Sequence, residues 1–245
     1  MKNVKTEFLF QKDSYLKEFE AKVVAIVENK VFLDKTAFHP GPSGGLDTDT
    51  GWLILPNGEK LEVEAVREED RGVAHLVKGD VSALAPGITV KGVINWERRH
   101  RMMRLHTASH VIAALLYEKY GARVTGGHIG PEVARDDFDL RGVKEWKNAL
   151  RWAVEEANKI IKKCIEVKVY WLPREEALKI PGIVKLADKL PPEIEKIRIV
   201  EIPGIDIQAD GGPHVKNTCE IGELEIVKLE SKGSRRRRIY YTVKP

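Results

Sequence analysis

The pattern of hydrophobic residues changes near Asn95 and divides the chain of 245 residues into two parts. Before that point the apolar residues form short β-branched runs between turn residues: AKVVAIV, VFLDKT, GWLIL, LEVEAV, GVAHLV and TVKGVIN. Such runs, with no long amphipathic helix among them, predict a small β-barrel-like domain over residues 1–95. Pro56-Asn57-Gly58 lies between two runs and predicts a hairpin. The segment His39–Gly51 is rich in Gly, Pro and Asp, so we expect a loop there.

After Asn95 the apolar residues follow the period of a helix. We expect one helix over Met103–Tyr120, ended by Gly121, and a core-facing helix over roughly Val143–Lys163. IEVKVYWL, IRIVEI, ELEIVKLE and RRIYYTV are expected to be strands, the last two joined as a hairpin, and PREEALKI a short helix. Helices and strands without strict alternation predict an α+β domain over residues 96–245.

Charge and cysteine content restrict the partners and the compartment. The net charge of +4 permits a polyanionic partner without requiring one, and the dense basic clusters are Arg98–Arg104 and Arg235–Arg238. No run of eighteen apolar residues occurs and the start is charged, so we expect a soluble, cytoplasmic protein with no membrane contact. The chain has two cysteines, Cys164 and Cys219, in different contexts, which favours reduced thiols over a disulfide. The sequence predicts no oligomeric state.

Two histidines four residues apart, His106 and His110, lie in an otherwise apolar segment. On a helix both imidazoles share a face and can reach one ion at a Zn–N distance of about 2.0–2.1 Å. Composition alone gives roughly 0.2 such pairs, so two structural polar residues remain an alternative. The glycines and proline of Asp210-Gly-Gly-Pro-His214 predict a tight loop that supplies a carboxylate and a third imidazole. Three nitrogens and one oxygen suit Zn²⁺, although this loop is also compatible with a solvent-facing turn.

Four segments together resemble a known family. RLHTASH, DGGPHVKNTCEIGELEI, LDKTAFHPGPSGGLDTDTGWL and KGSRRRRIYYTV are similar to the editing domain of alanyl-tRNA synthetases and to the freestanding alanyl-tRNA editing proteins called AlaX. The chain has no room for adenylation or anticodon-recognition domains, which favours the freestanding form. The resemblance implies hydrolysis of the ester that joins a wrong amino acid, chiefly serine and sometimes glycine, to tRNA(Ala).

The resemblance also implies roles for individual residues. Thr36 stands where the family senses the hydroxyl of serine, and Zn²⁺ ligation is carried onto His106, His110, Asp210 and His214. Asp210 stands where the family has cysteine, and a carboxylate is a harder ligand, which changes the expected metal preference. Cys219 is a less favoured substitute ligand. Ser43-Gly44-Gly45-Leu46 replaces the common Gly-Gly-Gly-Gln, so no role of that glutamine carries over.

An RNA substrate implies phosphate contacts from basic residues, which make binding depend on salt. The candidates are Arg98, Arg99, Arg101, Arg104, Arg235 and Arg237. Members of the second cluster alternate sides on a strand, so about two of its four arginines are expected to face RNA. Trp52, Trp96 and Trp171 are expected in the core rather than stacked on bases. Glu97 and Asp137 are candidates for a water-activating base.

The leading hypothesis is a zinc-centred hydrolase that edits mischarged tRNA(Ala) in trans. The alternative is a noncatalytic tRNA-binding module whose zinc is structural. A third hypothesis, a zinc hydrolase acting on small molecules, predicts activity that does not respond to salt or to added tRNA.

Overall fold

The computed structural model describes residues 5–42, 45–183 and 194–244. Within the chain there are two compact units, Met1–His100 and Arg101–Pro245. The boundary between them in the sequence follows His100, five residues beyond the boundary expected at Asn95. The long helix α2 (Trp96–Tyr120) begins in the first unit and continues in the second.

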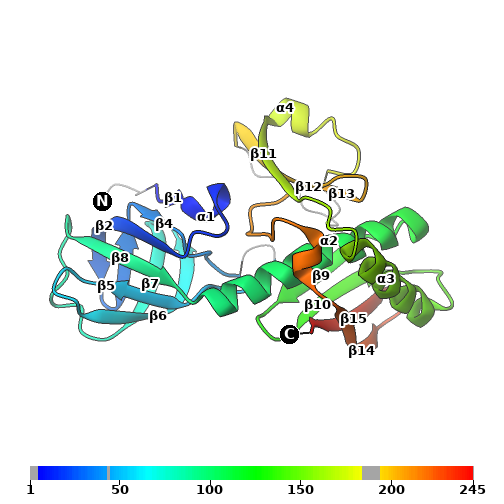
Figure 1. The fold of residues 1–245 in the computed structure, drawn as a ribbon, viewed down its shortest axis with the longest axis horizontal. Coiled ribbons are helices and arrows are strands. Elements are labelled where there is room, and N and C mark those ends of the chain that lie inside the picture. Colours follow the sequence, from blue (N-terminus) through cyan, green and yellow to red (C-terminus); the bar gives the residue numbers. More distant parts are fainter. Residues whose placement is uncertain (1–4, 43–44, 184–193, 245) are drawn as a thin grey trace. The chain divides into compact units, whose positions relative to one another are not determined.

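The first unit is a closed six-stranded barrel, as the β-branched runs predict (Figure 1). Its strands follow one another in the order β2-β3-β7-β6-β5-β8. Their bounds are β2 Glu18–Val27, β3 Lys30–Leu33, β5 Gly51–Ile54, β6 Lys60–Glu69, β7 Gly72–Lys78 and β8 Thr89–Ile94. Alternate residues of β2 and β6 point into the barrel, which is filled by aliphatic side chains together with Phe19 and Phe38. The short elements β1 (Glu7–Phe8), α1 (Leu9–Lys12) and β4 (Lys35–Thr36) complete the unit.

Two local predictions for this unit are confirmed. β5 and β6 pair antiparallel around Pro56-Asn57-Gly58, and Gly58 takes the positive φ of 86° that this turn needs. The described part of the segment between His39 and Gly51 is irregular except for an isolated bridge at Leu46. Residues 43 and 44 of the motif Ser43–Leu46 lie outside the described residues.

Helix α2 starts seven residues before the expected Met103. The side-chain Oδ1 of Asn95 accepts a hydrogen bond from the backbone N–H of Arg98 at 3.2 Å, which satisfies one of the first unpaired donors of the helix. Gly121 follows the last turn with a φ of 62°, as predicted. The run of arginines at its start hides the helical period, because one of them, Arg99, is buried.

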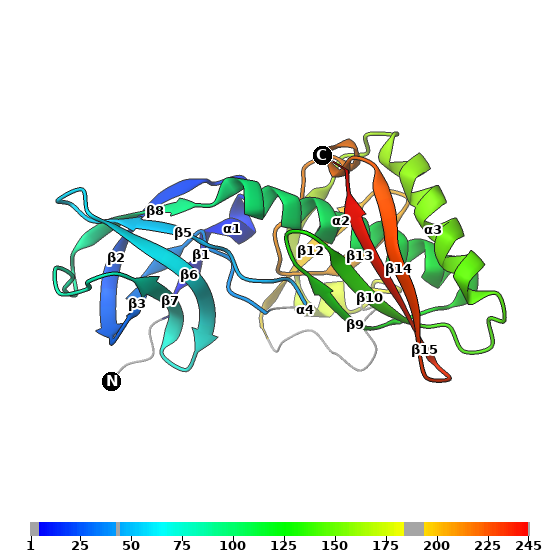
Figure 2. The same ribbon diagram turned by 90° about the horizontal axis from the view of Figure 1, so that it is seen from below.

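The described part of the second unit contains two antiparallel sheets. The larger has the order β14-β15-β10-β9, and α2 and α3 (Trp146–Ile161) lie next to it in both ribbon views (Figures 1 and 2). Its strands are β9 Val124–Ile129, β10 Ala134–Asp139, β14 Leu224–Lys232 and β15 Arg236–Val243. The smaller sheet has the order β11-β12-β13, with β11 Lys168–Pro173, β12 Lys196–Ile202 and β13 Asp206–Ala209. Helix α4 (Arg174–Ala177) and the 3-10 helix η1 (Thr218–Ile221) lie in the connections.

Cys164 and Cys219 form a disulfide, so the expectation of reduced thiols was wrong. They are 55 residues apart in sequence, but their Cα atoms are 4.5 Å apart. The segments that follow α3 and precede η1 run side by side: Thr218 N–H donates to the carbonyl of Ile165, and its hydroxyl accepts the N–H of Ile165, both at 2.9 Å. This long-range pairing is invisible in the local sequence. The bond also removes Cys219 as a metal ligand, since no thiolate remains.

Two of the three tryptophans expected in the core are exposed instead. Trp52 on β5 is 43% exposed and Trp171 on β11 is 41% exposed. Both occupy the outward-facing register of their strands, which β-propensity alone does not reveal. Trp96 is half-buried and stacks on the ring of His100, with 5.3 Å between ring centroids.

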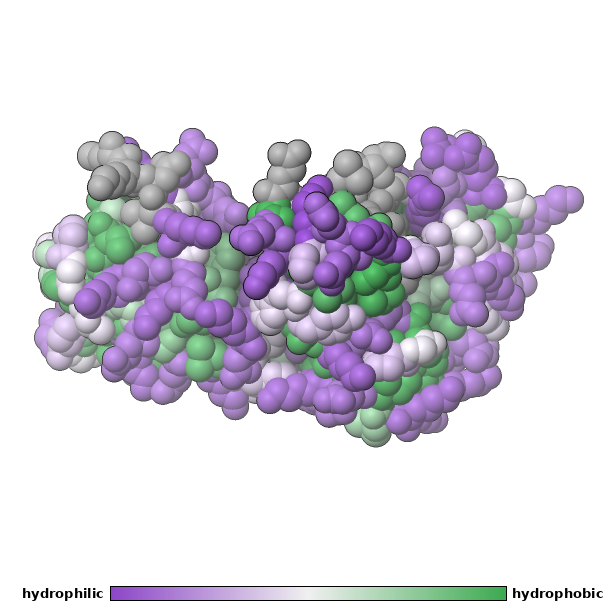
Figure 3. All heavy atoms as spheres, turned by 90° about the horizontal axis from the view of Figure 1, so that it is seen from above, coloured by the Kyte–Doolittle hydropathy of each residue, from purple (hydrophilic) through white to green (hydrophobic). Residues whose placement is uncertain are grey.

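Over the described ranges, every helix is too short or too polar to cross a membrane. Figure 3 shows that hydrophilic side chains cover most of the face drawn there. Hydrophobic side chains appear on that face only as small patches among them.

Candidate metal centre

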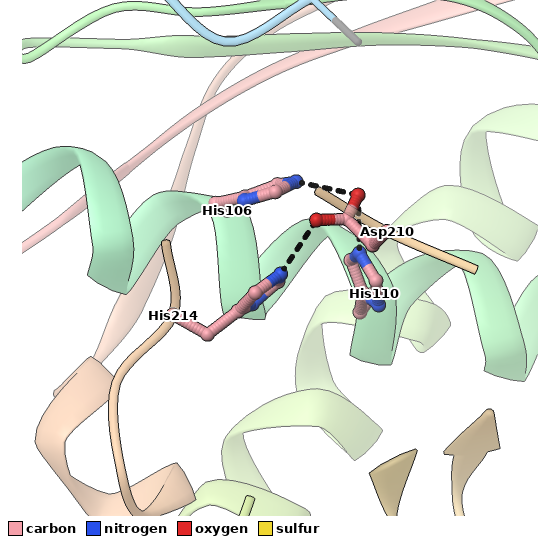
Figure 4. A group of neighbouring side chains, drawn as sticks. All are labelled: His106, His110, Asp210 and His214. Carbon is pink, nitrogen blue, oxygen red and sulfur yellow. Dashed lines mark hydrogen bonds and ion pairs between the residues drawn. The ribbon is translucent and has the colours of Figure 1, made fainter. Parts of the chain in front are cut away.

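Four side chains from two segments about a hundred residues apart meet in the second unit (Figure 4). His106 and His110 project from successive turns of α2, with their ring centroids 5.2 Å apart. Asp210 and His214 come from the loop after β13, and the ring of His214 stacks on that of His106 at 4.1 Å. One ligand atom from each of the four lies within 4.8 Å of every other, so the cluster can hold a metal ion.

The separations between these atoms fit a four-coordinate ion. The Oδ2 atom of Asp210 is 3.5 Å from Nε2 of His106 and 3.7 Å from Nε2 of His110. Its Oδ1 atom is 3.2 Å from Nε2 of His214. Ligand atoms placed about 2.0–2.1 Å from a tetrahedral zinc are about 3.3–3.4 Å from one another. The residues therefore fit Zn²⁺ in number and type, and the separations between Asp210 and the three histidines are close to those of a tetrahedral site.

Hydrogen bonds on the far side of the rings orient the two helix histidines. His110 Nδ1 lies 3.0 Å from Oδ2 of the buried Asp206, and His106 Nδ1 lies 3.3 Å from the carbonyl of Pro213. A carboxylate and a carbonyl only accept, so both Nδ1 atoms carry the proton. Each Nε2 then presents its lone pair to the cluster, which is the arrangement that metal-binding histidines use.

The third histidine is oriented by Thr107. The hydroxyl of Thr107 donates to the carbonyl of Met103 at 2.9 Å, so its oxygen can only accept from Nδ1 of His214, 3.1 Å away. The same oxygen accepts the backbone N–H of Val215 at 3.3 Å. Thr107 is completely buried. Its hydroxyl thus fixes the tautomer of His214 and leaves Nε2 as the ligand atom.

The loop that carries Asp210 and His214 approaches α2 so closely that residue 212 must be glycine. A Cβ on Gly212 would lie 2.7 Å from Cε1 of His106. The backbone N–H of Gly212 donates to Oδ1 of Asp210 at 2.7 Å and turns the carboxylate toward the histidines. Arg198 on β12 stabilises the loop, because its Nη1 donates to the carbonyls of Asp210 and Gly212, both at 2.9 Å.

The electrostatics of the cluster favour the protonation states that metal ligands need. Burial lowers the pKa of His214 well below its usual value, and the neighbouring His106 and His110 lower it further. Burial raises the pKa of Asp210, but the neighbouring His106 and the hydrogen bonds of all three histidines outweigh this and hold it well below its usual value. His214 is therefore neutral and Asp210 ionised at neutral pH. The three imidazoles are buried, whereas the side chain of Asp210 is 20% exposed and marks the accessible side.

The four arginines proposed at the start of α2 are held by the protein itself. Arg99 is fully buried and forms an ion pair with Asp49, which is also fully buried, so Arg99 is removed from the candidates for phosphate contact. Arg98 forms an ion pair with the carboxylate of Asp47 at 2.6 Å. Arg101 and Arg104 each donate to main-chain carbonyls of the second unit. Guanidinium groups committed in this way keep few donors for an RNA backbone.

The arginines of the second cluster face different surroundings. Arg235 has a side chain 62% exposed and pairs with Asp139 at 3.1 Å. Arg237 is half-buried, donates to the hydroxyl of Ser231 at 2.9 Å and lies over the ring of Trp146 at 5.3 Å.

The other proposed reaction residues lie in defined environments. Thr36, in the first unit, is fully buried and its hydroxyl lies 2.8 Å from Nε2 of His75. Asp137 is bound through both oxygens by Arg238, at 2.6 and 2.9 Å, so its carboxylate is already engaged by a guanidinium. Glu97 is exposed in the first turn of α2.

Sequence reasoning missed the residues behind the ligands. Thr107 offered a usable signal, since it is a polar residue placed between the two histidines of RLHTASH. Asp206 offered none, because it is 96 residues from the histidine that it orients.

Comparison with known proteins agrees with this architecture. Residues 197–240 match the family described as "Threonyl and Alanyl tRNA synthetase second additional domain", and residues 3–98 match "tRNA synthetases class II (A)". The chain is 59% identical over 241 residues to alanyl-tRNA editing protein AlaX-M of Saccharolobus solfataricus, covering 98% of this chain and 100% of the relative. The AlaX-M protein of Methanosarcina barkeri is 41% identical over 243 residues, covering 97% and 99%.

A longer relative matches over part of its length. An alanine-tRNA ligase of Saccharolobus islandicus is 36% identical over 228 residues, which are 92% of this chain and 25% of the ligase. The two AlaX-M relatives, in contrast, are matched almost from end to end. The chain belongs to the AlaX-M family of alanyl-tRNA editing proteins.

Proposed function

We propose that this protein is an aminoacyl-tRNA hydrolase that removes a wrong amino acid, chiefly serine and also glycine, from tRNA(Ala) in trans. The observation that carries the proposal is the cluster of three oriented imidazoles and one partly exposed carboxylate in a chain of the AlaX-M family. The names of the relatives supply the substrate class, and the cluster supplies a centre at which an ester can be attacked. Because tRNA charging belongs to translation, we place the activity in the cytoplasm.

The proposed ion is Zn²⁺, held by Nε2 of His106, His110 and His214 and by the carboxylate of Asp210. When bound, it supplies Lewis-acid chemistry toward an ester carbonyl. The chain contributes orientation, since Asp206, the carbonyl of Pro213 and Thr107 fix the rings behind it. Asp210 supplies the exposed side, from which the ester of the substrate would approach.

We also propose that Thr36 reads the hydroxyl of serine. His75 Nδ1 lies 3.0 Å from the carbonyl of Val31 and donates to it, so Nε2 accepts the hydroxyl proton of Thr36. Thr36 Oγ1 also accepts the N–H of Phe38 at 3.1 Å, which leaves one lone pair. That lone pair can accept from a serine hydroxyl that enters beside the buried Thr36, but gains nothing from the methyl of alanine. Glycine has no hydroxyl and would not be selected through Thr36.

The test is deacylation of seryl-, glycyl- and alanyl-tRNA(Ala) by the zinc-loaded protein. Wild type should release serine fast and spare alanine, and a His106→Ala, His110→Ala double variant should lose the activity. His128→Ala is the matched control, because His128 is exposed on β9 and belongs to no ligand set. Wild type that binds tRNA(Ala) but leaves all three esters intact would refute the hydrolase.

One observation favours a second candidate, a noncatalytic tRNA-binding module with a structural zinc. Four protein ligands with buried imidazoles are typical of structural zinc sites, which keep no open position. In that case zinc removal should lower the free energy of unfolding while wild type shows no esterase activity. Activity on small esters that ignores both salt and added tRNA would instead support a small-molecule hydrolase.

A further inference from the structure

A groove of about 970 Å³ in the second unit collects exposed basic side chains. It is formed by the end of α2, the start of β9, the end of β10 and the turn between β14 and β15. Its charged lining consists of Arg123, Arg141, Lys232, Arg235, Arg236 and Asp139. We propose that this basic groove binds the phosphate backbone of the tRNA. The inference rests on the proposed function for the identity of the RNA.

The charge balance supports this assignment. Five cations against one carboxylate give the groove an excess of four positive charges, and the net charge of the whole chain is also +4. Two carboxylates outside the lining reduce this excess, since Lys232 pairs with Glu230 at 3.2 Å and Arg236 lies 3.9 Å from an oxygen of Asp137. The carboxyl end of α2 adds about half a negative charge, which the five cations outweigh. A surface of this kind attracts polyanions over a distance.

The groove arginines pair with carboxylates too, but their side chains are more exposed than those of the arginines at the start of α2. The side chains of Arg141, Arg235 and Arg236 are 61%, 62% and 49% exposed. The arginines at the start of α2, in contrast, are committed to a buried carboxylate or to main-chain carbonyls. Phosphate contacts need guanidinium donors at the surface. Sequence reasoning selected Arg235 but not its neighbour Arg236, which lines the same groove.

The lining and form of the groove decide between classes of partner. Small-molecule sites are mostly lined by apolar side chains, whereas Tyr120 is the one large apolar residue in this lining. An anionic membrane is a broad surface, to which basic residues on a projecting face are better suited than those in a hollow. A polynucleotide strand carries its charges along a line and can lie in a groove.

The experiment compares the binding of deacylated tRNA(Ala) at several salt concentrations. The groove variant is Arg141→Gln, Arg235→Gln, Arg236→Gln, and the control variant is Arg151→Gln, Lys162→Gln, Lys163→Gln. The control removes three exposed charges from α3 and the residues after it, outside the groove. We expect the groove variant to bind roughly tenfold or more weakly and to lose roughly one unit of salt slope per phosphate contact removed. The control variant should bind as wild type does.

A variant that makes the groove more positive should strengthen tRNA binding. Asp139 is the groove's carboxylate, and it pairs with both Arg141 and Arg235. Its removal by Asp139→Asn releases both arginines and abolishes a repulsion toward phosphate. We expect binding to tighten by roughly two- to fivefold. A triple Arg→Lys variant at positions 141, 235 and 236 keeps the charges and should keep most of the salt slope.

The outcomes separate this inference from the proposed function, because binding is measured without an ester. The groove proposal would be refuted if a folded groove variant bound tRNA with wild-type affinity and salt slope. It would also be refuted if the control variant lost as much affinity as the groove variant. Wild-type binding to phosphatidylserine vesicles but not to tRNA would overturn it in favour of a membrane. If wild type binds tRNA through the groove but cleaves no ester, the proposed hydrolase activity is refuted and the proposed RNA-binding groove is supported. If both hold, the groove variant should raise the half-saturating protein concentration far more than it lowers the plateau rate of deacylation.

Discussion

Thr107→Val is the change that tests how the centre is built. Valine has nearly the same shape as threonine but cannot accept the proton of His214 Nδ1 or the N–H of Val215. Without that acceptor nothing holds His214 in the tautomer that presents Nε2 to the cluster. All four ligands remain in the chain, so any effect on metal binding comes from orientation alone.

The size of the effect follows from the two lost bonds. Loss of a partner that orients a metal ligand typically weakens metal binding by about 10- to 100-fold, or about 1.4 to 2.7 kcal/mol. The N–H of Val215 is left in a buried environment without its acceptor, which costs about 1–3 kcal/mol in the free energy of unfolding of the metal-free protein. Thr107→Ser keeps the hydroxyl and should retain most of the metal affinity.

The assay is a competition titration of Zn²⁺ against a chelator of known affinity, paired with urea denaturation. Thr218→Val is the matched control. Thr218 is also fully buried, donates to the carbonyl of Ile161 at 3.3 Å and accepts the N–H of Ile165 at 2.9 Å, but it contacts no ligand. Both valine variants should lose stability, and only Thr107→Val should lose zinc affinity. Unchanged zinc affinity in folded Thr107→Val would refute the orienting role.

Asp210→Cys should strengthen Zn²⁺ binding and leave less affinity for harder ions, and competition titrations that show no change in preference would contradict the ligand assignment. Cys219→Ser should lower the free energy of unfolding by about 4 kcal/mol, the chain-entropy value for a loop of 55 residues, and equal melting temperatures with and without reductant would count against it. Asp49→Asn leaves Arg99 buried without its partner and should cost about 3–5 kcal/mol in urea denaturation, whereas a loss below 1 kcal/mol would contradict the burial of this pair. Burial lowers the pKa of His75 to about 4, so the unfolded chain binds a proton at a higher pH than the folded protein does. The free energy of unfolding should therefore decrease as the pH falls from about 6.5 to 4. His75→Gln should lessen this decrease.

The barrel and the ligand cluster were readable from the sequence because their signals are local. β-branched runs with turn residues between them specify strands, and a spacing of four places two imidazoles on one side of a helix. The glycines of Asp210-Gly-Gly-Pro-His214 indicated a close approach, and Gly212 indeed lies against His106. Each of these signals lies within one element or one turn, whereas the meeting of the two halves of the cluster joins segments about a hundred residues apart.

Other features depend on contacts that short stretches of sequence do not encode. β9 contains two glycines and β10 carries three aspartates, so neither reads as a strand until its neighbours in the sheet are known. The disulfide and the bond between His110 and Asp206 join residues 55 and 96 positions apart. The early start of α2 escaped notice because Arg99 is a charged residue in a buried position, which a hydrophobic pattern counts as surface.

The position of Arg99 affects where the chain can be cut. Its guanidinium donates to the carbonyls of Ser14 and Ala37 as well as to the carboxylate of Asp49, so one side chain fastens three separate stretches of the barrel unit. A fragment ending at Asn95, where the hydrophobic pattern changes, would contain the six strands but lack this fastening. Asp49 would then be an unneutralised charge in the interior. A fragment ending at His100 would keep it, so the smallest autonomous barrel should include the first turn of the helix that follows it.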